Sequence, residues 1–491
     1  MNRKNPSNSQ GTLATGLLIP GGRLFGLVAM MALLAILQGC AYVKPVPNEP
    51  LTQWDPDGGY RFRNFKLPES LHTDGLLIVA AFSGGGTRAS TLAFGVLREL
   101  SRQQITVEGK QKRMLDELDV IFALSGGTFT AGYYALHGDQ IFHDFEARFL
   151  RKDWESELKA RIFWNPSNWI RLWSPYFGRA HLMAELLDES LFEGATYGDL
   201  LKRNERPWLV IHASDMATLS RFEFHQQQFD LICSDLSRLP IAWASASSAA
   251  LPLVLSPISL KNYAGQCGYQ VPAWLVNEKR RGKIGARRVG AQRANELLSY
   301  LDIEKRPNIH LLDGGLSDNM ALRGLIEGVS VMGGLEAFLN EGHLKGVRKF
   351  VVLAVNAETS PDVLEYRSDH IPVISKASSA MVDLPINRYS FDTVTLLRQG
   401  LENARLKLRV DRRAPDSPLS PDAEVYFINA SLSEVDDPNE REALMKIPTT
   451  LYLTDPQIDR LLLAASRLIR NDPEFQRLMR DLQTSPEPPK N

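Results

Sequence analysis

The chain has little cysteine and almost no net charge. Its 491 residues include three cysteines, at positions 40, 233 and 267, which excludes a disulfide-rich scaffold and a cysteine-based zinc cluster. The formal net charge of −1 provides no field to attract a polyanion, so we expect no nucleic acid partner. Internal repeats and low-complexity segments are also missing. With 44% hydrophobic and 23% charged residues, the chain has the composition of a soluble globular protein.

The N-terminal segment has no acidic residue before Glu49. It contains an unbroken run of fourteen apolar or glycine residues, Leu24–Leu37. A helix needs about 20 such residues to cross a bilayer. The run is therefore too short to span a membrane and is typical of a secretory signal peptide.

The apolar run ends at a candidate lipidation site. Leu37-Gln38-Gly39-Cys40 resembles the lipobox of bacterial lipoproteins, which implies that Cys40 is lipidated and that residues 1–39 are a signal peptide. No Asp follows Cys40, so the resemblance favours an outer-membrane lipoprotein whose body faces the periplasm. An uncleaved signal anchor is the alternative. The proline-rich start of residues 40–74 predicts an extended tether.

Export would also place the other two cysteines in an oxidising compartment. In an oxidising periplasm Cys233 and Cys267 could form a disulfide. Two unpaired buried thiols are an equally good interpretation of the sequence.

The body of the chain alternates apolar runs with helical patterns. The runs are continuously hydrophobic, which indicates strands buried on both faces. With helices between them, they predict βαβ units and a mostly parallel sheet. The expected strands are 76–82, 120–124, 208–211, 309–312 and 350–355.

A C-terminal helix is expected after a capping box at Thr454–Gln457. The apolar residues that follow recur at helical spacing and predict a buried stripe. They are Ile458, Leu461, Leu462, Ala465, Leu468 and Ile469.

Ser125 is the candidate nucleophile. It follows the expected second strand in Ala123-Leu124-Ser125-Gly126-Gly127, and a helix of small residues begins after it. Small neighbours permit the strained strand-to-helix turn that exposes a serine hydroxyl. A plain Ser-Gly-Gly turn is the alternative interpretation of this motif alone.

Three glycines end the first strand. Gly84, Gly85 and Gly86 leave backbone N–H groups uncovered, as an oxyanion hole requires. Arg88 either holds this loop in shape, which we favour, or contacts a lipid phosphate. The spacing of Gly84, Gly86 and Ala89, with Glu108 further on, also fits a dinucleotide fingerprint. That interpretation lacks a good second strand and leaves Ser125 unexplained.

The strand at 309–312 ends in Asp313-Gly314-Gly315. A carboxylate at a strand end, beside two glycines that allow close approach, suits a base aimed at a neighbouring strand. Taken alone, the motif is equally typical of an Asx-turn.

Together the three turns resemble the patatin-like phospholipase family. The resemblance covers about residues 75–330 and extends to the small-residue segment Ala244–Pro252. It implies a three-layer α/β/α sandwich, hydrolysis of lipid acyl esters, and a Ser125–Asp313 dyad without histidine. Gly84–Gly86 would form the oxyanion hole, supported by Arg88, Gly126, Gly127, Gly314 and Gly315. We expect a catalytic domain at 75–330 and a C-terminal α/β extension, 331–491, packed on it.

Two alternatives concern the chemistry. An α/β-hydrolase triad would need a histidine after Asp313, for which His343 and His370 are the candidates. A catalytically silent envelope lipoprotein could use the fold for binding or scaffolding. In the dyad mechanism the partner is a lipid or phospholipid substrate, and neither a metal nor another cofactor is called for.

Two surface segments are candidates for membrane contact. Residues 154–179 combine seven aromatic side chains with arginines, as at a membrane interface or in a lid; packing beneath an insertion is the alternative. Residues 279–293 predict a solvated basic loop, with anionic headgroups as a second possibility. The basic residues are Lys279, Arg280, Arg281, Lys283, Arg287, Arg288 and Arg293.

Overall fold

The structure is a computed structural model. It describes residues 45, 48–65, 75–107, 110–281, 287–332, 334–341, 344–360, 390–406, 408 and 417–483. The expected signal peptide at 1–39, Cys40, His343 and His370 lie outside the described residues, so those expectations stay predictions.

An eight-stranded mixed sheet forms the centre of the molecule. Its five strands from β12 to β6 run parallel, β10 is antiparallel to β6, and β9 is antiparallel to β10. The short β7 (Arg221–Glu223) pairs antiparallel with β6. The mostly parallel sheet expected from the sequence is therefore confirmed. The main order is β12 (Leu419–Ser431), β11 (Val347–Asn356), β2 (Leu76–Phe82), β5 (Leu118–Leu124), β6 (Trp208–Asp215), β10 (Asn308–Leu312) and β9 (Ile258–Lys261).

Continuous hydrophobicity identified the central strands well. Every residue of β2, β5 and β6 is buried, because helices cover both faces of the sheet. The edge strand β12 escaped prediction, since Pro421, Asp422 and Glu424 interrupt its apolar pattern. Within the described residues, two further small sheets lie outside the central one. In one of them, β3 (Gln104–Val107) pairs with β4 (Lys110–Arg113), so it supplies no second strand for a dinucleotide fold.

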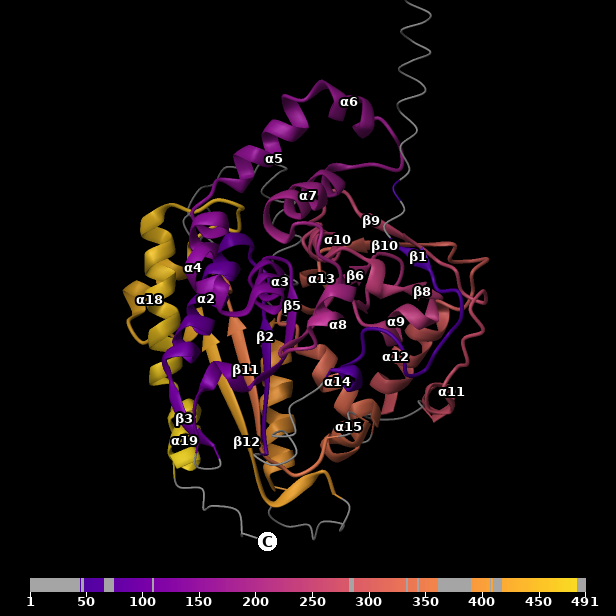
Figure 1. Cartoon of the computed structure of the whole chain (residues 1–491). Helices are drawn as coiled ribbons and strands as arrows, with labels where there is room; N and C mark the ends of the chain where they lie inside the picture. The colour runs from indigo at the N-terminus through magenta and orange to yellow at the C-terminus, as the bar shows by residue number, and fades with distance from the viewer. Residues whose placement is uncertain are drawn as a thin grey trace, which may run out of the picture.

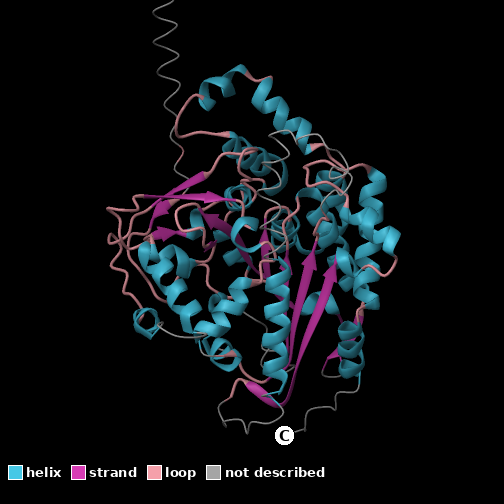
Figure 2. Cartoon of the chain, turned by 180° about the vertical axis from the view of Figure 1, so that it is seen from behind, coloured by secondary structure: helices cyan, strands magenta, loops and turns pink. Residues whose placement is uncertain are grey.

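Helices form a layer on each side of the sheet (Figures 1 and 2). One layer contains α2, α3 and α18, and the other contains α12, α14 and α15. The described helices with their own bounds are α2 (Gly86–Arg102), α3 (Gly127–His137), α4 (Ile141–Phe145), α5 (Trp154–Phe163), α6 (Pro166–Leu172), α7 (Arg179–Leu187), α8 (Tyr197–Arg203), α9 (Gln226–Leu231), α10 (Ile241–Ser248), α11 (Ala273–Arg281), α12 (Arg287–Ser299), α13 (Gly315–Asp318), α14 (Arg323–Met332), α15 (Leu335–Glu341), α17 (Pro438–Met445), α18 (Asp455–Asn471) and α19 (Pro473–Gln483). Residues 390–406 are also helical.

The C-terminal part of the chain completes the central sheet. β11 lies between β12 and β2 and pairs with β2 from Lys349↔Leu76 to Val355↔Phe82. Helix α18 begins at the expected capping box and buries all six residues of the expected stripe. It packs against α2 so closely that a Cβ on Gly95 would lie 2.6 Å from Ala465 Cβ. The extension thus shares one core with the domain before it.

Residues 48–65 are docked on the body, which differs from the expected tether over residues 40–74. β1 (Glu49–Pro50) pairs with β8 (Ser234–Asp235). Tyr60 is fully buried, and its hydroxyl hydrogen-bonds the backbone of Leu209. These contacts offset the preference of the prolines for an extended chain.

A buried ion pair and a disulfide fasten the same segment. Arg61 and Asp230 lie 2.6 Å apart, both almost fully buried. Cys233 and Cys267 are joined in a disulfide, with their Cα atoms 5.5 Å apart. Each half of the disulfide also accepts a backbone hydrogen bond from the N-terminal segment, Cys233 from Leu51 and Cys267 from Trp54. Among the described residues, no helix is both long and apolar enough to cross a bilayer.

Candidate active site

Ser125 lies on a strained turn between β5 and α3. Its φ angle of 45° is in the left-handed region, which a side chain other than glycine rarely adopts and which the surrounding structure must enforce. The turn buries the residue and directs its backbone N–H to Ser248 Oγ, 2.7 Å away. The predicted nucleophile therefore has the backbone geometry of a nucleophile elbow.

Asp313 meets Ser125 directly. The Ser125 hydroxyl donates to Asp313 Oδ2 over 2.9 Å, and the Gly315 N–H donates to Asp313 Oδ1 over 2.8 Å. The sequence pattern predicts Asp313 at the carboxyl end of a parallel strand. Instead, β10 enters antiparallel from beyond the end of β6, pairing Leu312 with Ser214. The carboxylate reaches the same edge of the sheet from the opposite direction.

Burial makes Asp313 a better base than an ordinary aspartate. Loss of hydration raises the pKa of Asp313 to about 6, although its hydrogen bonds from the Gly315 N–H and the Ser125 hydroxyl act in the opposite direction. Aspartate in water has a pKa near 4. A carboxylate with a pKa of about 6 is still ionised at neutral pH and holds a proton more readily in a transition state.

The glycine loop offers a different set of N–H donors from the one expected. The Gly84 N–H donates to the carbonyl oxygen of Asn319 at 3.3 Å. By contrast, the N–H groups of Gly85, Gly86 and Gly126 have no hydrogen-bond acceptor among the described residues. Gly126 lies against Gly86, because a Cβ on Gly126 would be 2.5 Å from the Gly86 nitrogen. The open donors thus gather next to Ser125.

Arg88 holds this loop against the C-terminal part of the chain. Its guanidinium donates to the carbonyl oxygens of Ala357 and Ile447 and to Thr449 Oγ1. The neighbouring Thr87 N–H donates to the carbonyl of Thr450 over 2.9 Å. Arg88 is buried. These contacts support the loop-holding role that we favoured over phosphate contact.

Ser248 links the two candidate catalytic turns, although no sequence pattern distinguishes it from the other serines of residues 244–252. Its hydroxyl accepts the Ser125 N–H and donates to the carbonyl of His212. Its own carbonyl accepts the Gly314 N–H over 2.9 Å. One side chain therefore fixes the elbow relative to β6, and its backbone fixes the turn that carries Asp313.

Replacing Ser248 with alanine should lower kcat about tenfold with little change in KM, because the Ser125 N–H and the His212 carbonyl would lose their buried partner. Steady-state kinetics on a soluble ester, with thermal unfolding alongside, checks this. Ser247→Ala is the matched control, since the Ser247 hydroxyl bonds only within α10, to Trp243 O. Equal effects of the two substitutions would contradict the role of Ser248.

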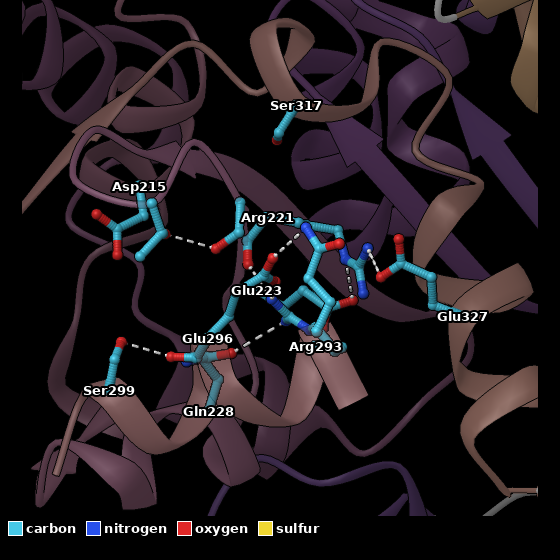
Figure 3. A network of polar contacts seen from close by, with 12 residues as sticks. Asp215, Arg221, Glu223, Gln228, Arg293, Glu296, Ser299, Ser317 and Glu327 are labelled. Carbon is cyan, nitrogen blue, oxygen red and sulfur yellow. Dashed lines mark hydrogen bonds and ion pairs between the residues drawn. The ribbon is translucent and has the colours of Figure 1, made fainter. Parts of the chain in front are cut away.

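A buried charge network joins β7 to α12 and α14 (Figure 3). Arg221 pairs with Glu223 at 3.0 Å and with Glu327 of α14 at 2.9 Å. Arg293 of α12 contacts Glu223 at 3.3 Å and donates to the Arg221 carbonyl. The network joins α12 and α14 to the sheet, and removing one partner of such a buried pair costs about 3–5 kcal/mol.

The prediction of a solvated basic loop at 279–293 is therefore wrong for Arg293, which is buried in this network. The described parts of that segment belong to the ends of α11 and α12. Lys279 and Arg280 are exposed, as a solvated basic segment requires. Arg293 is buried because Glu223 and Glu296 neutralise it.

A cavity of about 660 Å³ lies on the face of the sheet covered by α12, α14 and α15. Ser125 and Asp313 are not among its lining residues. Its sheet wall is formed by Leu77, Val79, Val120, Phe122 and Trp208.

No histidine among the described residues hydrogen-bonds Ser125 or Asp313. His212, on the neighbouring strand, faces Glu223 at 3.5 Å, and burial lowers the pKa of His212 to about 3. In the described part of the chain, no group of three or more His, Cys, Asp or Glu side chains could hold a metal ion.

The sheet, the elbow and the Ser125–Asp313 pair define an α/β protein with a serine–carboxylate site. The family model for patatin-like phospholipases matches residues 80–326, slightly more than half of the sequence. The chain therefore belongs to the patatin-like phospholipase family, a family of lipid acyl hydrolases. No curated protein matches the sequence closely enough to count as a relative.

Solved structures to which the chain shows similarity include human GIVD cytosolic phospholipase A2, 13% identical, with a TM-score of 0.43 over 90% of this chain and 68% of that one. The same human protein in complex with methyl gamma-linolenyl fluorophosphonate is 10% identical, with a TM-score of 0.41 over 90% and 66% of the two chains. VipD from Legionella pneumophila is 12% identical, with a TM-score of 0.26 over 80% and 67%.

Proposed function

We propose that this chain is a serine lipid-acyl hydrolase that uses a Ser125–Asp313 dyad at the bacterial cell envelope. The 2.9 Å hydrogen bond between the two side chains carries the proposal. It joins a hydroxyl on a strained elbow to a carboxylate whose pKa burial raises to about 6. A catalytically silent member of the family would have no need for such a pair, and no observation favours that alternative.

The geometry supports a two-step acyl transfer. Asp313 takes the proton of Ser125 as Oγ attacks the acyl carbonyl, and the resulting oxyanion is held by the N–H groups of Gly85, Gly86 and Gly126. Collapse of the tetrahedral intermediate releases the alcohol, which receives the proton from Asp313. Water, deprotonated by Asp313, then attacks the acyl-serine; the fatty acid is released as Asp313 returns the proton to Ser125 Oγ. The N-terminus of α3 adds a favourable dipole.

The pH dependence of hydrolysis tests this assignment. Asp313 must be ionised to act as the base, and its pKa is raised to about 6, so its protonated, inactive form dominates below that pH. We expect kcat/KM on a fluorogenic long-chain ester to rise with pH, with a midpoint of about 6, and to level off above it. The same measurement on Ser125→Ala should give the background rate at every pH. Equal rates for both proteins would leave only a lipid-binding body.

For localisation, we propose that Cys40 carries the lipid that anchors the protein to the outer membrane, with its body in the periplasm. The lipobox-like residues 37–40 and the apolar run before them support this. Several acyl chains on one cysteine, at about 0.8 kcal/mol per buried CH₂, give a durable anchor. Metabolic labelling with a clickable fatty acid, lost on Cys40→Ala, is the direct check.

A further inference from the structure

Helices α5 and α6 form an arch that stands away from the body (Figures 1 and 2). We call residues 154–177 the aromatic arch. Its base is packed, because Trp154, Leu158 and Phe177 are buried. Its outer part is exposed to solvent: the four largest apolar side chains there are between 50% and 83% exposed. They are Phe163, Trp164, Trp169 and Trp173.

Such exposure needs an explanation. Tryptophan and phenylalanine dominate cores and interfaces because they bury a large apolar surface, and several exposed together mark an interaction surface. None of the four rings stacks on another aromatic ring among the described residues. The alternative that all these aromatics pack beneath an insertion thus holds only for the base of the arch.

Each basic side chain of the arch is paired with a glutamate. Within residues 154–177 the cations are Lys159, Arg161 and Arg171. They pair with Glu155, Glu189 and Glu185 respectively, and the Arg171 guanidinium also lies 4.0 Å from the centre of the Phe177 ring. The part of the arch that faces outward is therefore apolar rather than basic. It suits the interfacial region of a lipid layer, where aromatic rings are favoured.

The apolar surface continues to the candidate active site. Directly after the arch, Arg179 donates to the carbonyl of Leu253 over 2.9 Å. Leu253 and Val254 are themselves exposed. They follow Ala250, whose carbonyl accepts the Asp313 N–H over 3.0 Å. The exposed pair thus lies next to the end of the arch and within four residues of a backbone contact with Asp313.

The docked N-terminal segment limits how far the body can lie from its anchor. Asn48 is docked on the body, where its side chain hydrogen-bonds Ser234 and Lys261. If Cys40 is lipidated, only eight residue steps separate the anchor from the body, at most about 29 Å when fully extended. β1 lies in the same upper half of the molecule as the arch (Figure 1).

We propose that the aromatic arch, with Leu253 and Val254, docks on the lipid bilayer by inserting apolar side chains, so that the site takes its substrate from the membrane surface. The inference rests on the proposed function and specifies the physical form of the substrate: lipid in a bilayer rather than dispersed ester. Binding of this kind depends on buried apolar area and only weakly on salt.

The test uses the full-length protein reconstituted on vesicles. Trp164→Ala/Trp173→Ala should hydrolyse phosphatidylcholine in vesicles about tenfold more slowly, because two interfacial aromatic anchors are lost. Its rate on a water-soluble short-chain ester should stay unchanged, and quenching of tryptophan fluorescence by brominated lipid should fall. Trp274→Ala, an exposed tryptophan on α11, is the matched control and should leave all three measurements unaltered.

Each other outcome has a definite meaning. Equal losses on both substrates would overturn the proposal, because the arch would then shape the site itself. Unchanged rates and quenching in the double variant would overturn it too. A strong fall in vesicle binding at high salt, or a requirement for anionic phosphatidylglycerol, would replace apolar insertion by charge attraction. If the unmodified protein cleaves neither ester while brominated lipid still quenches its tryptophans, the proposed hydrolase fails and the docking surface stands.

Discussion

Replacing Asp313 with asparagine should lower kcat/KM for ester hydrolysis by about 10²- to 10⁴-fold, the range expected when a general base is removed. Asparagine has nearly the same shape, and its carbonyl oxygen can still accept the Gly315 N–H that now bonds Asp313 Oδ1. Only the proton acceptor for Ser125 is lost. Steady-state kinetics on a fluorogenic ester, over a range of pH, measures the effect, and the rise in rate near pH 6 should disappear with the carboxylate.

A double variant makes this prediction sharper. Ser125 and Asp313 act as one unit across their hydrogen bond, so Ser125→Ala/Asp313→Asn should be no slower than the worse single variant. Multiplied losses would mean that the two residues work independently. A retained rate in Asp313→Asn would transfer the role of base to another group, for which His343 and His370 would be the first candidates.

Gly126→Ala should reduce kcat by about 10²- to 10³-fold, the effect of losing an oxyanion donor. The added methyl group would lie 2.5 Å from the Gly86 nitrogen and closer still to the Gly86 carbonyl oxygen. Backbone cannot rotate away as a side chain can. The turn after Ser125 and the Gly85–Gly86 loop must therefore separate, which displaces the open N–H groups on both sides. Burst and steady-state kinetics on the same ester measure the loss.

Gly400→Ala provides the matched control for a glycine-to-alanine change. Gly400 lies in the helix at 390–406, and a Cβ there would meet nothing within 4 Å. Alanine should leave the rate unchanged and stabilise the helix by up to about 1 kcal/mol. Thermal unfolding of both variants separates a local loss of catalysis from unfolding. A Gly126→Ala protein with full activity would show that these donors take no part.

The sequence specified the buried centre of the fold because its signal is local. Strands β2, β5 and β11 each contain a continuous apolar run, and the cap and the apolar stripe of helix α18 lie within one short stretch of sequence. The docking of residues 48–65 could not be predicted from local sequence. It depends on Arg61 meeting Asp230, 169 positions away, and on Tyr60 entering a core made by other segments.

In the candidate site, too, some features follow from local sequence and others depend on residues far apart in the chain. Ser125 and Asp313 could be named because each stands in a short glycine-rich motif after a strand. The direction of β10 could not, since an apolar run carries no information about which way it pairs. Gly84 was expected to donate to the oxyanion, but Asn319 takes its N–H, a contact with no sequence signal. Ser248 could not be distinguished by sequence from the other small residues of 244–252.

The contacts of Thr87 and Arg88 with residues 447–450 have a consequence for synthesis. The loop that would stabilise the oxyanion is held by carbonyl and hydroxyl groups near the end of the chain, whereas Ser125 is made much earlier. A chain cut after Asp313 would contain the nucleophile and its carboxylate but would lack the residues that hold this loop in place. We therefore expect the proposed activity to appear only once residues 447–450 have folded against this loop.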